Sequence, residues 1–261
     1  YSANALGGAG GPLAVLIIAI VASELGKAVS KETRVDILVT PLVTIFSGVG
    51  LSMLIAAPIG AAASQVGTLI MWATEQAPLV MGILVSVIVG VALTLPISSA
   101  AICAALGLTG LAGGAAVAGC CAQMIGFAVM SYKENGVGGL VSQGLGTSML
   151  QMGNIVKNPR IWIAPTLASA ITGPLATCVF HFEMNGAAVS SGMGTCGLVG
   201  QIGVYTGWVS DIAAGTKAAI TPMDWAAMVL LCFVLPAVLS VIFCEIERKL
   251  GWIKEGDLKL N

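Results

Sequence analysis

The longest stretch of this chain without an acidic or basic side chain covers residues 76–132, and it constrains the fold more than any other feature. Four further stretches also lack such residues: 37–74, 161–180, 184–210 and 225–244. A transmembrane helix needs about 20 consecutive apolar residues to cross roughly 30 Å of hydrocarbon. Several stretches are that long, and the longest is nearly three times the length of one span. The pattern therefore predicts a polytopic integral membrane protein that contacts the lipid bilayer.

The composition excludes other classes. Only 9% of the residues are charged, whereas soluble domains have about a quarter, so a soluble enzyme is excluded. A formal net charge of -1 gives no basic surface for nucleic acid. The 7 cysteines lie in apolar segments without CxxC spacing beside a single histidine, so we expect small buried side chains, no disulfide framework and no metal site. Continuous apolar runs favour helices over the alternating segments of an outer-membrane barrel.

The apolar runs predict an all-α, polytopic transmembrane helix bundle of about 7–10 membrane segments. The 34 glycines permit close helix packing and re-entrant or broken helices. We expect Pro58 to end a helix over 37–57, because proline removes a backbone donor. Residues 60–72, 140–156 and 184–208 are uncharged but polar. This combination is typical of re-entrant or cavity-lining segments.

We expect a single transmembrane domain over 1–261, ending in a cytoplasmic tail at 247–261 that frays. Lysine and arginine are enriched in cytoplasmic loops, and the tail holds four such residues: Arg248, Lys249, Lys254 and Lys259. The first residue is Tyr1 rather than methionine, which leaves open that residues precede it.

His181 and Glu183 are the most informative ionisable pair, because they end a long apolar run and begin a Gly- and Ser-rich segment. Ionisable groups at membrane depth are costly and usually face a cavity or a partner. Together with Asn185, the pair predicts a site that binds hydroxyl groups, relays protons or holds an ion. The alternative is that they mark the end of a span, where charge is cheap. We expect Asp211 and Lys217 to form a solvated pair across a short loop.

A glycine-rich run at 192–197 includes Gly194 and Thr195. Glycines let the backbone turn and approach a ligand closely, and a helix broken here would direct its end at a solute. Flexible packing is the competing interpretation. No Gly-Lys-Ser/Thr follows, so a phosphate-binding P-loop is excluded. We find no self-contained catalytic motif, and we assign no catalytic residue and no cofactor.

Residues 158–171 read NPRIWIAPTLASAI, with an Asn-Pro dipeptide, Pro165 and a following Leu-Ala pair. This stretch resembles the membrane (EIIC) subunits of the bacterial phosphoenolpyruvate:sugar phosphotransferase system, in which Asn-Pro precedes an apolar run, a proline and an Ile/Leu-Ala span. The block 181–201 looks more like a divergent EIIC-like branch that includes the perfringolysin-regulator type of membrane protein. The clear resemblance covers residues 151–201.

The resemblance implies a homodimeric permease of the bacterial inner (cell) membrane that binds a small polar solute, such as a carbohydrate, and moves it by alternating access. Separate IIA and IIB proteins would supply any phosphoryl group, because the chain has no room for a phosphocysteine or phosphohistidine region. The polar residues of the two segments form the expected solute-binding set: Gln143, Thr147, Gln151, Asn158, His181, Glu183, Asn185, Gly194 and Thr195.

One departure from the family pattern leaves two alternatives open. Sugar-transporting members carry an acid in an Asn-Glu-Pro or Thr-Glu-Pro motif about ten residues before the Asn-Pro, and that acid binds sugar hydroxyls. Residues 146–149 here read Gly-Thr-Ser-Met, without the acid. Its absence favours a non-transporting membrane regulator or sensor with the same fold. A proton- or ion-coupled secondary transporter is the other alternative, with His181 and Glu183 as its relay.

Overall fold

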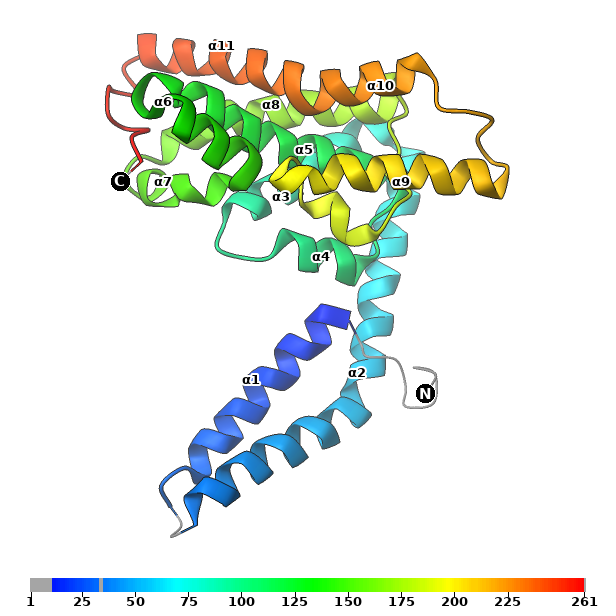
Figure 1. The fold of residues 1–261 in the computed structure, drawn as a ribbon, viewed down its shortest axis with the longest axis vertical. Helices are drawn as coiled ribbons and strands as arrows, with labels where there is room; N and C mark the ends of the chain where they lie inside the picture. The colour runs from blue at the N-terminus through cyan, green and yellow to red at the C-terminus, as the bar shows by residue number, and fades with distance from the viewer. Residues whose placement is uncertain (1–10, 33–34, 261) are drawn as a thin grey trace. The chain divides into compact units, whose positions relative to one another are not determined.

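The structure is a computed structural model that describes residues 11–32 and 35–260 (Figure 1). The described residues form α-, 3-10 and π-helices, with an isolated β-bridge between Gly110 and Met184. The predicted all-α fold is therefore confirmed. Two compact units make up the chain: the first extends to Thr68 and includes Ala104–Leu106, and the second comprises Leu69–Cys103 and the chain from Gly107 onward.

The first unit contains α1 (Gly11–Val29) and most of α2 (Asp36–Gln76). Gly26 of α1 lies so close to Thr44 of α2 that a Cβ at this position would overlap the threonine hydroxyl. Such small residues allow the close approach of helices in lipid. Only 6% of the most apolar window of α2 is buried within the protein, so the apolar side chains of this window are largely uncovered.

The helix α2 continues through Pro58 without a break, so the prediction that Pro58 ends a helix is wrong. In water, an interior proline costs a hydrogen bond and crowds the preceding turn. Transmembrane helices tolerate proline, because neighbouring side chains and small local adjustments satisfy the freed backbone groups. Residues 60–72 therefore belong to a continuous helix rather than to a re-entrant segment.

The second unit begins with the last turns of α2 and contains all the remaining helices. In chain order these are α3 (Pro78–Thr94), α4 (Ser99–Leu106, whose end belongs to the first unit), α5 (Gly110–Met130), α6 (Tyr132–Val141), η2 (Ser142–Gly146), η3 (Ser148–Gln151), α7 (Met152–Lys157), η4 (Pro159–Trp162), α8 (Ile163–Pro174), η5 (Leu175–Val179), η6 (Ala188–Gly192), η7 (Cys196–Leu198), α9 (Val199–Ala214), α10 (Pro222–Val229), η8 (Leu230–Val234) and α11 (Leu235–Lys249).

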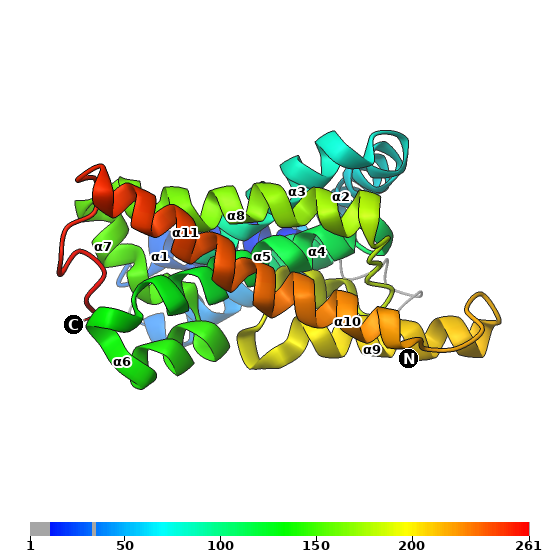
Figure 2. The same cartoon turned by 90° about the horizontal axis from the view of Figure 1, so that it is seen from above.

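Helix α5 is the buried centre of the second unit. Its most apolar window is 89% buried, and α3, α8 and α11 pack around it (Figure 2). Gly119 faces the backbone carbonyl of Ser86 on α3, and a Cβ at Gly119 would overlap that carbonyl. Gly126 packs in the same way against Pro165 of α8 and Ser240 of α11. The small side chains of α5 thus let three neighbouring helices approach it closely.

The described residues include four helices long and apolar enough to cross a membrane, which agrees with the predicted transmembrane bundle. They are Asp36–Gln76, Gly110–Met130, Pro159–Val179 and Pro222–Lys249, and the shorter apolar helix Pro78–Thr94 accompanies them. The last two long helices pass through the π-helical turns η5 and η8.

Two hairpins of irregular and short-helical backbone flank α5. In chain order, the first hairpin covers residues 132–158 and the second covers residues 182–214. The second hairpin (residues 182–214) begins where Met184 exchanges two 3.0 Å backbone hydrogen bonds with Gly110, at the start of α5. It then descends along α5 until the Thr195 hydroxyl contacts the Met124 sulfur at 3.6 Å. The 14 residues from Gly110 to Met124 correspond to roughly 20 Å at 1.5 Å per residue. Helix α9 returns with its glycines packed against residues 185–194 of the descending segment, which completes a re-entrant hairpin.

The first hairpin (residues 132–158) comes from the opposite end of α5. Its turn η2 places Gly144 against Ile125 of α5. Ser148 then forms a 2.9 Å hydroxyl–hydroxyl hydrogen bond with Thr94, the last residue of α3. Irregular backbone at membrane depth is tolerated only when protein buries it or a cavity hydrates it, and α3 and α5 provide that cover here.

Candidate functional site

The tips of the two hairpins meet beside the C-terminal half of α5. The Thr195 hydroxyl donates a 2.5 Å hydrogen bond to the Gly144 carbonyl oxygen. Thr195 is fully buried, and Gly194 has a positive φ of 52° that an L side chain rarely adopts. The two polar segments that the sequence singled out, one on each hairpin, are therefore in direct contact.

A buried amide lies next to this meeting point. Gln123 of α5 is fully buried, and its Oε1 accepts hydrogen bonds from Trp162 Nε1 at 3.0 Å and from Thr94 Oγ1 at 3.4 Å. Its Nε2 donates to Thr166 and Ser169 hydroxyl oxygens at 3.3 and 3.4 Å. All four hydrogen-bonding positions of the amide are thus used, and Gln123 ties α3, α5 and α8 together.

A cavity of about 510 Å³ lies at the other end of α5, where the second hairpin begins. It is within the size range of small-molecule sites, roughly 300–1,000 Å³. Its lining combines aromatic, acidic, basic and amide side chains: Phe180, His181, Phe182, Glu183, Asn185, Trp208, Asp211, Thr216, Lys217, Met223, Asp224 and Ala227. Three of the predicted site residues, His181, Glu183 and Asn185, therefore lie together in this cavity.

Asn185 organises the acidic side of the cavity. Its Nδ2 donates hydrogen bonds to Glu183 Oε2 at 3.0 Å and to Asp211 Oδ2 at 2.9 Å. Its Oδ1 accepts the Gly110 backbone N–H at 3.2 Å. One amide thus holds two carboxylates near each other and fixes both to the first residue of α5.

Lys217 forms the opposite wall. Its Nζ lies 2.8 Å from Asp224 Oδ1 and 5.7 Å from the ring centre of Trp208. The expectation that Lys217 pairs with Asp211 is therefore wrong. Asp224 is the capping acid of α10, because it exchanges hydrogen bonds with Thr221, and this cap holds the carboxylate where Lys217 can reach it.

His181 is at the point where the chain leaves the π-turn η5. Its positive φ of 44° turns the backbone toward the bridge with the start of α5. His181 and Glu183 both follow the end of an apolar helix and line the cavity, so the two interpretations of the pair stay open.

Two other predicted site residues, Gln151 and Asn158, bind the chain's own C-terminal segment. Gln151 Nε2 donates to the Leu258 carbonyl oxygen at 2.9 Å and to Gln143 Oε1 at 2.9 Å. Asn158 Nδ2 donates to the Trp252 carbonyl oxygen at 2.9 Å. The expectation that the tail frays is therefore wrong for its described residues, because amide side chains hold its backbone.

Thr147, the remaining predicted site residue, has a local role in the first hairpin. Its hydroxyl accepts the Met149 backbone N–H at 3.1 Å and caps η3. It lies close in sequence to Gly144 and Ser148, and thus near the meeting point of the hairpins.

Sequence reasoning missed Trp208 and Asp224 as lining residues of the cavity, and it took Asp211 for part of a loop pair. These residues lie 25 or more positions beyond Glu183, with Trp208 and Asp211 on α9 and Asp224 on α10. The return of α9 along residues 185–194 brings the first two to Glu183. Gln123 was missed for a different reason, since it is a single polar residue inside a long apolar run. A lone amide at membrane depth is costly unless it is paired, and this cost was the available signal.

Among the residues that the structure describes, no group of three or more His, Cys, Asp or Glu side chains is placed to hold a metal ion. The cysteines are free, and five of them, Cys103, Cys120, Cys121, Cys232 and Cys244, are buried.

Fold and site together define an all-α membrane protein with opposed re-entrant hairpins and a polar cavity. The family model described as "Phosphotransferase system, EIIC" matches residues 2–260. The chain therefore belongs to the EIIC family, whose members are membrane components of sugar transport by the phosphotransferase system. Searches among curated proteins and among solved structures found no match. The match does not test the likeness to the perfringolysin-regulator type, which stays a prediction.

Proposed function

We propose that this chain is the membrane subunit that binds and translocates a small carbohydrate in a phosphoenolpyruvate-dependent phosphotransferase system. The observation that carries the proposal is the EIIC family match over residues 2–260. Separate IIA and IIB proteins would supply the phosphoryl group to the transported sugar. The two units would act as one transmembrane domain, and the protein would function as a homodimer.

The cavity supports a hydroxyl-rich solute. Carboxylates of Glu183 and Asp211 accept hydrogen bonds from hydroxyl groups, the Lys217 ammonium group donates them, and a neutral imidazole can do either. Trp208 supplies an aromatic ring with an apolar face and a polar N–H. A carbohydrate has hydroxyl edges and apolar C–H faces, so it fits a lining of this kind. We propose His181, Glu183, Asn185 and Asp211 as its polar contacts.

The distribution of basic residues supports an orientation. In the second unit, seven lysines and arginines lie at the end of α5 that carries the tail: Lys133, Lys157, Arg160, Arg248, Lys249, Lys254 and Lys259. The cavity end has Lys217 alone among residues 69–260. Cytoplasmic loops carry an excess of basic residues. We therefore place the tail in the cytoplasm of a bacterium and the cavity on the outer side of its inner membrane.

The contact between the hairpins supports alternating access. A solute in the cavity is separated from the cytoplasmic end by the buried contact of Thr195 with Gly144. Movement of one hairpin relative to the other would break this contact and expose polar groups of both tips, including Thr147. Transporters of several folds move discontinuous segments in this way around a site near the midplane.

Uptake into proteoliposomes tests the proposal. The full chain is reconstituted, and a panel of radiolabelled hexoses, hexosamines and disaccharides is offered with or without phosphoenolpyruvate and soluble phosphotransferase proteins. We expect accumulation of a phosphorylated sugar only with these components. Glu183→Gln should reduce uptake by about 10²-fold if this carboxylate binds hydroxyls through charge-assisted hydrogen bonds. The exposed Glu245→Gln is the matched control and should leave uptake unchanged.

The other outcomes identify the alternatives. Uptake that follows an imposed proton gradient, without phosphoenolpyruvate, would indicate an ion-coupled transporter with His181 and Glu183 as relay. No uptake of any sugar would favour a regulator, in agreement with the missing acid at residues 146–149. Either result would overturn the proposed function.

A further inference from the structure

The segment that follows α11, residues 250–260, is held by amide side chains on and beside the first hairpin. We name this set the amide clasp: Asn135, Gln151, Asn154 and Asn158. Asn135 and Gln151 both donate to the Leu258 carbonyl oxygen, at 2.8 and 2.9 Å. Hydrogen bonds from side-chain amides to backbone carbonyls fix the position of a chain whatever its side chains are.

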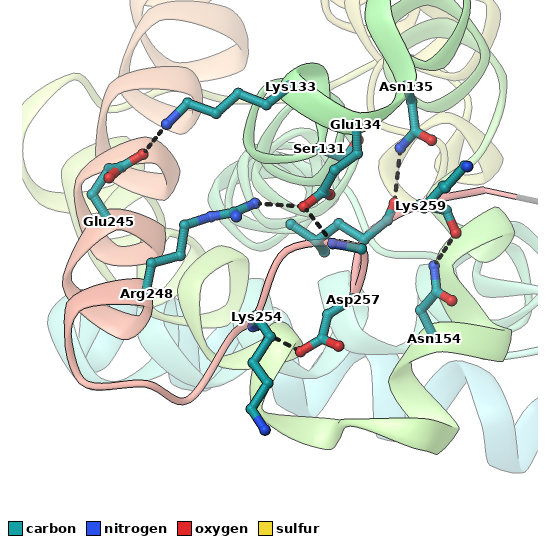
Figure 3. Close-up of polar contacts among 12 residues, drawn as sticks. Ser131, Lys133, Glu134, Asn135, Asn154, Glu245, Arg248, Lys254, Asp257 and Lys259 are labelled. Atoms are coloured by element: carbon teal, nitrogen blue, oxygen red, sulfur yellow. Dashed lines mark hydrogen bonds and ion pairs between the residues drawn. The ribbon is translucent and has the colours of Figure 1, made fainter.

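The clasp continues toward both ends of the segment, and Figure 3 shows the contact of Asn154 with Lys259. Asn154 donates to the Lys259 carbonyl oxygen at 2.9 Å, and Asn135 Oδ1 accepts the Leu260 backbone N–H at 2.8 Å. Asn158 reaches the beginning of the segment through the Trp252 carbonyl oxygen. The segment is thus bound along its length rather than at one point.

Apolar and ionic contacts secure the same segment. Leu258 and Ile253 are 0% and 3% exposed and pack into a cluster with Phe127 of α5. Glu134 of α6 accepts hydrogen bonds from Arg248 Nη2 at 3.0 Å and from the Gly256 backbone N–H at 3.3 Å. Docking removes both apolar side chains from water, which favours the bound position of the segment.

The bound segment is connected to the meeting point of the hairpins. From the Leu258 carbonyl, a hydrogen bond of 2.9 Å leads to Gln151, and another of 2.9 Å leads from Gln151 to Gln143. Gln143 is fully buried, and the next residue, Gly144, accepts the hydrogen bond from Thr195. The tail therefore contacts the part of the first hairpin that would have to move during transport.

We propose that residues 250–260 form a latch that holds the first hairpin in its docked position and so restrains transport. Release of the segment would free the amides of Gln151 and Asn158, both predicted to bind solute, and would let the tip at Gly144 separate from Thr195. The restraint of transport rests on the proposed function. The hold on the hairpin rests on the contacts alone, so the two can fail separately.

The test uses the full chain with Leu258→Asp, which introduces charge into the apolar anchor without changing the first hairpin. Leu250→Asp is the matched control, because Leu250 is 58% exposed in the same segment. Hydrogen–deuterium exchange then follows the backbone amides of residues 139–151. We expect exchange about tenfold faster in Leu258→Asp, together with faster tryptic cleavage after Lys254, because local opening becomes easier. Leu250→Asp should match the original chain in both measurements.

Uptake in the proteoliposomes described above is the second measurement. We expect Leu258→Asp to raise the initial rate about fivefold, at the lower end of typical coupling between two sites. A tail that is released while exchange in 139–151 stays unchanged would overturn the latch, and so would a fall in uptake. If no chain transports any sugar, the proposed function fails, and the exchange result alone decides whether the tail holds the hairpin. Should Leu258→Asp not fold, Leu258→Ala against Leu250→Ala gives the same comparison.

Discussion

Thr195 and Gly144 are 51 residues apart in sequence and share a 2.5 Å hydrogen bond from the threonine hydroxyl to the glycine carbonyl oxygen. Each belongs to a hairpin that follows α5 from a different end. The bond is buried away from water. Movement of one hairpin relative to the other would break it.

The first prediction concerns this bond. Thr195→Val keeps the shape of the side chain but removes the donor, which leaves the Gly144 carbonyl without its partner. We expect the free energy of unfolding to fall by about 1–3 kcal/mol, the cost of an unsatisfied buried acceptor. Thermal unfolding in detergent measures the change. Thr195→Ser restores the hydroxyl and should recover most of the loss, and equal losses in both variants would contradict the assigned role of the bond.

The second prediction concerns the packing of α5 against α3. A Cβ at Gly119 would overlap the Ser86 carbonyl, so Gly119→Ala must push the helices apart. We expect a loss of about 1–3 kcal/mol, as for other overpacked cores. Gly138→Ala is the control, because nothing lies within 4 Å of that position, and alanine has the higher helix propensity. Unfolding midpoints that rank the two variants in the opposite order would contradict this packing.

The sequence was sufficient for the fold class, because long uncharged runs and abundant glycine leave few alternatives to a helical membrane bundle. It was also sufficient to mark the hairpins at 140–156 and 184–208, since uncharged polar segments are stable at membrane depth only when protein covers them. It failed at Pro58 because the local rule for proline derives from helices in water.

The assignment of side chains within the hairpins could not be completed from the sequence. Gln143, Gln151 and His181 all have polar groups suited to a solute, yet the first two contact other protein groups and His181 lines the cavity. The difference arises from the tail, which packs against the first hairpin. The tail engages Gln151 directly and Gln143 through Gln151. Its charged composition suggested fraying, whereas the buried Leu258 and Ile253 determine its docked position.

The third prediction concerns the amide that bridges two acids in the cavity. Asn185→Asp removes the donor that satisfies Glu183 and Asp211 and places a third carboxylate between them. Like charges at this distance repel, and the two acids lose their shared donor. We expect solute binding to weaken by at least about tenfold, the effect of losing roughly 1.4 kcal/mol.

A second substitution in the same chain separates charge from shape. Asn185→Asp combined with Asp211→Asn exchanges the amide and the carboxylate, so that one donor again faces one acceptor. Binding measured by calorimetry with the sugar identified from uptake should recover in part in the double variant. No recovery at all would contradict the role assigned to the Asn185 amide as the donor that holds the two carboxylates.

The fourth prediction concerns a carboxyl group that no contact satisfies. Glu247 of α11 is 4% exposed, and neither of its carboxyl oxygens has a hydrogen-bond partner among the described residues. Burial of a polar group without a partner is costly, and burial of a charge costs more. Glu247→Gln keeps the shape and removes the possibility of charge. It should raise the free energy of unfolding, because a buried amide without a partner costs about 1–3 kcal/mol and a buried charge costs more.

Glu245, two residues earlier on the same helix, is the matched control for this substitution. Its carboxylate lies 2.7 Å from Lys133 Nζ, and both side chains are substantially exposed. Exposed ion pairs contribute about 0–1 kcal/mol, so Glu245→Gln should change the unfolding midpoint little and in the opposite direction. If Glu247→Gln destabilises the protein instead, the Glu247 carboxyl group has a stabilising partner. The prediction that its burial costs stability would then be wrong.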